Sequence, residues 1–119
     1  MKRFFRSVLH ALNGIKFHIK TGKNFQLQGM AALLVIGLGI MVHLNTVEWL
    51  VVLLFIGGVL ALETFNSALE ALSDEVTLEI RPGIRKAKDL AAAAVLLFSL
   101  TAFVGGLIIF IPKIVEYFD

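Results

Sequence analysis

The sequence contains no cysteine, and this absence narrows the chemistry that the chain can support. It excludes a disulfide framework, a thiolate metal site and a cysteine nucleophile. No glycine-rich P-loop is present either, so the chain is not a P-loop kinase. His10, His18 and His43 are scattered along the sequence, which argues against a histidine metal site or a Ser-His-Asp arrangement. The charged N-terminus lacks a short apolar core with a small-residue cleavage site, so we expect no cleaved signal peptide.

Charge is also scarce and unevenly distributed. Charged residues make up 17% of the chain and hydrophobic residues 58%, whereas an average soluble domain is about a quarter charged. Residues 24–47 and 90–112 carry no charge, and residues 49–72 carry only Glu63 and Glu70. Each stretch exceeds the roughly 20 residues that a helix needs to cross a bilayer. A soluble protein with buried core helices is the alternative, but a chain of 119 residues could hardly cover three such helices.

These patterns predict an all-α integral membrane protein that forms a single domain over residues 1–119. Apolar residues at three- and four-residue spacing beside a basic face predict an amphipathic surface helix at about 2–20. The three transmembrane helices are expected at about 26–45, 47–75 and 84–111.

The basic residues cluster before the first predicted span and between the second and third spans. The positive-inside rule places both regions in the cytoplasm and, with three spans, the C-terminus outside. Anionic lipid head groups and this topology explain the cations more simply than nucleic acid does, so no nucleic-acid partner is expected.

The second predicted span ends in polar residues that share one helical face. On a helical wheel, Glu63, Asn66, Glu70 and Asp74 lie within about 80° of each other, and they extend about 16 Å along the axis. A charged side chain at membrane depth is unfavourable by a few kcal/mol or more and usually has a function. We call these four residues the polar stripe and interpret them as a connection between a lipid-borne group and a water-soluble one.

The residue types indicate a reaction class. A carboxylate near the membrane interface can act as a general base toward an alcohol, and a second carboxylate can hold Mg²⁺ together with substrate phosphates. Lys88 supplies a charge for phosphate oxygens, while Asp89 is expected to pair with Lys88 or to bind a ligand hydroxyl. Together these groups favour phosphoryl transfer from a magnesium nucleotide to a lipid alcohol.

The segment ETFNSALEALSD, followed by KAKDLAAAAVL, resembles the small prokaryotic diacylglycerol kinase and undecaprenol kinase family. The resemblance covers the whole chain, with Phe65 and Ser73 as mild departures from the family pattern. It implies a lipid kinase of the bacterial inner or plasma membrane that uses ATP as co-substrate with Mg²⁺. It also implies a homotrimer whose active sites are shared between neighbouring subunits.

The resemblance further implies roles for individual residues. Glu63 matches the catalytic base for the lipid hydroxyl, and Glu70 matches a metal-binding carboxylate. The residues implied in ATP binding are Arg3, Asn66, Glu70, Glu79, Lys88 and Asp89.

One departure from the family concerns the metal. Where the family usually carries a second metal-binding glutamate, this sequence has Gly22. Glu70, the ATP phosphates and water remain as ligands, and Mg²⁺ usually keeps several waters.

The segment PGIRKAKDLAAAAVL resembles the undecaprenol kinase branch of the family more closely, and this resemblance slightly favours undecaprenol over diacylglycerol as the lipid substrate. Two other functions stay open. One is a weakly active or inactive family member that binds lipid or acts as a scaffold, and the other is a transporter subunit that uses the intramembrane carboxylates for protons.

Overall fold

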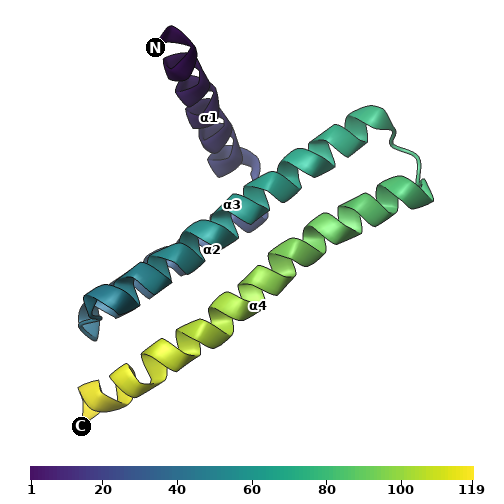
Figure 1. Ribbon diagram of the computed structural model, residues 1–119. Helices are drawn as coiled ribbons and strands as arrows, with labels where there is room; N and C mark the ends of the chain where they lie inside the picture. The colour runs from purple at the N-terminus through teal and green to yellow at the C-terminus, as the bar shows by residue number, and fades with distance from the viewer.

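The computed structural model describes residues 1–119 as four helices joined by short connections. The helices are α1 (Lys2–Thr21), α2 (Lys23–Met41), α3 (Thr46–Val76) and α4 (Pro82–Phe118). In Figure 1, α3 and α4 run antiparallel beside each other, α2 lies behind α3, and α1 projects away at a steep angle. The all-α prediction is confirmed.

Three of the helices, α2, α3 and α4, are long and apolar enough to cross a membrane, as predicted. Only 9 of the 119 residues are buried, so most apolar side chains of these helices point outward. Exposed apolar surface on this scale is unfavourable in water and suits the hydrocarbon interior of a bilayer, where the helices satisfy their own backbone groups. The position of α1 on the membrane surface stays a prediction.

Helix α4 is longer than the sequence suggested. It continues through Pro112 to Phe118, so the expected end near residue 111 was wrong. A proline inside a helix removes one backbone hydrogen bond and often ends the helix. Here the following turn is held against the rest of the structure, because Lys113 Nζ lies 3.3 Å from Glu48 Oε1 and Ile114 packs against the buried apolar cluster.

The other helix ends differ from the prediction by a few residues. Helix α2 begins at Lys23 rather than about 26, and it ends at Met41 rather than near 45. Asn45 instead caps α3: its side chain accepts a hydrogen bond from the Glu48 N–H, and the Glu48 carboxylate accepts one from the Asn45 N–H, both at 2.9 Å. This capping box satisfies two backbone donors, which explains why the second span starts where the first was expected to end.

Two phenylalanines set the register of α3 against α4. A Cβ at Gly58 would overlap the ring of Phe98, and a Cβ at Gly105 would overlap the ring of Phe55. The two rings lie edge to face, with centroids 6.4 Å apart. Each helix therefore receives an aromatic ring from the other at a glycine near its middle, and this fit determines which turns of α3 and α4 face each other.

Candidate functional site

A polar cavity of about 340 Å³ lies where the end of α3, the connecting loop and the start of α4 meet. Four residues predicted from the sequence line it, namely Glu70, Glu79, Lys88 and Asp89. The other lining residues are Thr77, Leu78, Ile80, Arg81, Ile84, Arg85 and Ala92. The cavity therefore combines carboxylates with two arginines and a lysine, which are the side chains that bind phosphate groups.

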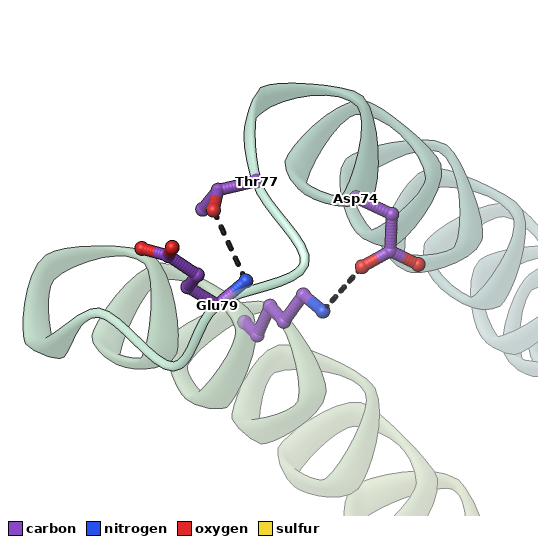
Figure 2. Close-up of polar contacts among 4 residues, drawn as sticks. Asp74, Thr77 and Glu79 are labelled. Carbon is purple, nitrogen blue, oxygen red and sulfur yellow. Dashed lines mark hydrogen bonds and ion pairs between the residues drawn. The ribbon is translucent and has the colours of Figure 1, made fainter.

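The connecting loop and the start of α4 shape this cavity. The Glu79 N–H donates to Thr77 Oγ1 at 3.0 Å, which turns the loop after α3 (Figure 2). Pro82 stands at the beginning of α4, where its missing N–H is not needed. The N-cap residue, Arg81, makes no side-chain capping bond. The first N–H groups of α4 are thus left without a side-chain acceptor, and the helix dipole favours an anion there.

Each of the three cations that line the polar cavity forms an ion pair with a carboxylate. Lys88 Nζ lies 2.7 Å from Asp74 Oδ1, and Figure 2 shows Asp74 on the last turns of α3 with its carboxylate directed toward α4. Arg85 pairs with Asp89 at 3.7 Å, so of the two alternatives for Asp89 the pair with Lys88 was wrong, while binding of a ligand hydroxyl stays a prediction. Successive residues on a helix point in different directions, and Asp89 instead meets the residue four positions earlier. Arg81 pairs with Glu79 at 3.8 Å.

The two arginine ion pairs contribute little stability, so the arginines can readily exchange their carboxylate partners. The side chains of Arg85 and Asp89 are 65% and 71% exposed, and those of Arg81 and Glu79 are 57% and 81% exposed. Solvent-exposed pairs typically contribute only about 0–1 kcal/mol. A polyphosphate entering the cavity can therefore replace the carboxylates as partner of the arginines at little energetic expense.

Glu63 and Asn66 lie deeper along α3 and do not line the polar cavity. Both are buried, at 5% and 9% exposure, and no salt bridge reaches Glu63. The Asn66 Oδ1 atom has no hydrogen-bond partner within the protein. An unsatisfied buried acceptor is unfavourable by about 1–3 kcal/mol, which is consistent with a ligand that supplies the missing donor. Along the helix axis, Glu63 lies about 10 Å from Glu70.

An apolar cavity of about 490 Å³ lies along the part of α3 that precedes Glu63, away from the polar cavity. It runs between α2, α3 and α4, and Leu60, which precedes Glu63 by one turn, is among the residues that line it. Fifteen of its 18 lining residues are hydrophobic. Helix α3 therefore connects an apolar cavity to a polar one, with Glu63 and Asn66 between them.

The donor set of the polar cavity fits a magnesium ion that arrives with phosphate groups. No group of three or more histidine, aspartate or glutamate side chains converges on one point. Glu70 lines the cavity and takes part in none of the ion pairs, so its oxygens are available. Mg²⁺ commonly uses one or two carboxylates together with substrate phosphates and water, and Glu70 fits the place of such a carboxylate.

Comparison with known proteins identifies the family of the chain. The sequence model of the family described as prokaryotic diacylglycerol kinase matches residues 9–110. The chain belongs to this family. It is 40% identical over 114 residues to the undecaprenol kinase of Bacillus subtilis, covering 96% of this chain and 93% of that protein. It is 30% identical over 111 residues to the diacylglycerol kinase of a Synechocystis species, covering 92% of this chain and 63% of that protein.

The structure adds residues to the site of this diacylglycerol kinase family member and leaves one predicted residue outside the polar cavity. Arg3 lies at the exposed N-terminal end of α1 and does not line the polar cavity, so its role in ATP binding stays a prediction. Arg81 and Arg85 line the cavity, whereas the sequence indicates only their contribution to the topology; their position at the start of a helix is the available signal. His18 is buried against α3, and nothing in its local sequence indicated a partner there.

Proposed function

We propose that this protein is an ATP-dependent lipid kinase that transfers the γ-phosphoryl group to the hydroxyl of a membrane lipid alcohol. The observation that carries the proposal is the order of groups along α3. A buried carboxylate, Glu63, lies between an apolar cavity and a polar cavity lined by Glu70, Lys88 and two arginines. A lipid hydroxyl approaches Glu63 from the membrane side, and the nucleotide approaches from the water side.

The nucleotide phosphates occupy the polar cavity. Arg81, Arg85 and Lys88 exchange their carboxylate partners for phosphate oxygens, which accept charge-assisted hydrogen bonds. Glu70 would hold Mg²⁺ in this cavity, and the chemistry that the ion would supply there is neutralisation of negative charge on the phosphates. Asn66 lies between the two cavities, where its free Oδ1 can accept a hydrogen bond from a nucleotide or lipid hydroxyl.

Glu63 acts as the general base. Its carboxylate accepts the proton of the lipid hydroxyl as the alcohol oxygen bonds to the γ-phosphorus. The bond between the γ-phosphorus and the oxygen that bridges it to the β-phosphorus breaks, and ADP leaves with that oxygen. The buried position of Glu63 excludes competing water, which limits hydrolysis of ATP.

Undecaprenol is the proposed acceptor in preference to diacylglycerol. The match to the Bacillus subtilis undecaprenol kinase is closer, and it spans nearly the whole of both chains. By the positive-inside rule, the polar cavity faces the cytoplasm, where ATP is available, and the C-terminus lies outside. The family membership supports a homotrimer with shared active sites in the bacterial inner or plasma membrane.

The proposal is tested by measuring transfer of labelled γ-phosphate in vesicles that contain either undecaprenol or diacylglycerol. We expect both lipids to be phosphorylated, with a higher kcat/KM for undecaprenol. A higher value for diacylglycerol would contradict the substrate assignment. Binding of magnesium-ATP without transfer to any lipid alcohol would contradict the kinase and favour a lipid-binding or scaffold function.

Replacement of Glu70 by glutamine is expected to raise the Mg²⁺ concentration needed for half-maximal rate. Loss of even an outer-shell partner typically weakens metal binding roughly 10- to 100-fold, and Glu70 is the only cavity carboxylate without an ion pair. The measurement is a Mg²⁺ titration at fixed total ATP. Glu116→Gln, at the opposite end of α4, is the matched control and should leave the titration unchanged; equal midpoints for both variants would remove Glu70 from the metal site.

A further inference from the structure

His18 is the single buried residue of α1. The residue is only 6% exposed. Its ring bridges to α3 through both nitrogens, with Nδ1 3.2 Å from Thr64 Oγ1 and Nε2 3.1 Å from Ser67 Oγ. The ring also packs on Phe25 of α2, with centroids 4.2 Å apart. Helix α1 otherwise has no buried side chain, so this histidine is the main contact between α1 and the membrane helices.

The hydrogen bonds assign the tautomer of His18. The Thr64 hydroxyl donates its only proton to the Leu60 carbonyl at 2.8 Å, so Thr64 Oγ1 must accept from His18. His18 Nδ1 therefore carries the proton, and Nε2 accepts from the Ser67 hydroxyl. Free neutral histidine prefers the proton on Nε2, so the two α3 hydroxyls select the less common form.

Gly22 provides the space for this ring. A Cβ at Gly22 would lie 2.7 Å from His18 Nε2 and 2.9 Å from the His18 carbonyl oxygen. The backbone of Gly22, at φ −89° and ψ 100°, is extended and open to any residue. The requirement for glycine is therefore steric rather than conformational, and it arises from the imidazole together with the His18 carbonyl oxygen.

The partners of His18 lie on the same turn of α3 as Glu63 and Asn66. Thr64 directly follows Glu63, and Ser67 directly follows Asn66. Gln26 reinforces the same corner, since its Nε2 donates to the Ile19 carbonyl at 2.7 Å. The Gln26 bond thus fixes α2 to α1, and the two hydrogen bonds of His18 hold this junction against the Glu63 turn.

We propose that His18, protonated on Nδ1, is a positioning residue that holds the α1–α2 junction on the Glu63 turn of α3, and that Gly22 is required to admit its ring. The consequence for catalysis rests on the proposed kinase function: the contact orients Glu63 toward the lipid hydroxyl. The nucleotide cavity lies farther along α3 and does not include His18, Thr64 or Ser67. Loss of His18 should therefore act on kcat and spare the binding of magnesium-ATP.

The tautomer is measured by ¹⁵N NMR of histidine-labelled full-length protein in lipid bilayers, without any assay of activity. The spectrum is recorded about two pH units above the ordinary histidine pKa of about 6.5. The exposed His10 and His43 are internal references and should show the common Nε2–H form. We expect His18 to show Nδ1–H; an Nε2–H signal from His18 would overturn the proposal even if the protein is an active kinase.

A double-mutant cycle then tests the link between His18 and Gly22. Gly22→Ala should lower Tm in the wild-type background, because the new Cβ displaces the ring. In the His18→Ala background only the carbonyl contact remains, so the same change should shift Tm much less. Equal shifts in both backgrounds would contradict the steric relation, and this result too is independent of catalysis.

Steady-state kinetics test the positioning role. His18→Ala should lower kcat by about tenfold or more, as expected when a reacting group is misplaced, while KM for magnesium-ATP stays within about twofold. His18→Asn, whose amide N–H can still donate to Thr64, should recover part of the loss. His10→Ala is the control on the same helix and should behave as wild type. An unchanged kcat in His18→Ala would overturn the positioning role.

Discussion

Replacement of Glu63 by glutamine is expected to lower kcat for lipid phosphorylation by about 10²- to 10⁴-fold, the usual contribution of a general base. Glutamine has nearly the same size and can still form hydrogen bonds, but it cannot take the proton of the lipid hydroxyl. Because Glu63 does not line the polar cavity, KM for magnesium-ATP should change little. The measurement is transfer of labelled γ-phosphate to undecaprenol in vesicles, with each substrate varied in turn.

Glu75→Gln is the matched control for this experiment. Glu75 lies on the same helix but is exposed, and on a helical wheel it falls about 120° away from Glu63. It should retain wild-type kcat. If Glu63→Gln and Glu75→Gln retained equal activity, Glu63 would not be the base, and its burial would need a structural explanation.

Replacement of Lys88 by methionine is expected to lower kcat/KM for magnesium-ATP by roughly 10- to 150-fold. This range corresponds to the loss of one hydrogen bond to a charged group, about 1.5–3 kcal/mol. Methionine preserves most of the apolar side-chain volume while removing the cation. The measurement is the initial rate as a function of magnesium-ATP at saturating lipid, supported by direct nucleotide binding to the protein in bilayers.

Two further variants separate a phosphate contact from a structural role of Lys88. Lys86→Met removes a neighbouring exposed cation that does not line the cavity, and it should have little effect. Asp74→Asn removes the 2.7 Å partner of Lys88 while leaving the lysine free to bind phosphate. If Asp74→Asn were as damaging as Lys88→Met, the ion pair itself would be the important feature rather than a contact to ATP.

Much of the site could be predicted from the order of residues along single helices. Glu63 and Asn66 are both buried on α3, in agreement with their placement on one helical face. Glu70, Glu79, Lys88 and Asp89 share a cavity, although they come from two helices and a loop. Their convergence follows from a short connection between two adjacent antiparallel helices, which necessarily brings the end of one close to the start of the next.

The pairing of charges could not be predicted in the same way. Lys88 contacts Asp74 across the helix interface, and Asp89 turns to Arg85. Which turns of α3 and α4 face each other depends on their axial register, and that register depends on how Phe55 and Phe98 fit against glycines of the opposite helix. Periodicity in one helix carries no information about such a fit.

By itself, the sequence determined three helices long and apolar enough to span a membrane, with a polar stripe on the second of them, because hydrophobic length and helical periodicity are local properties. Only the tertiary structure decided that α4 continues past Pro112 and that His18 meets Thr64 and Ser67, more than 40 residues away. It also explains why position 22 is a glycine, since a Cβ there would overlap the ring of His18. These features arise from contacts between side chains that are distant in the sequence, and such contacts exist only once the helices have packed.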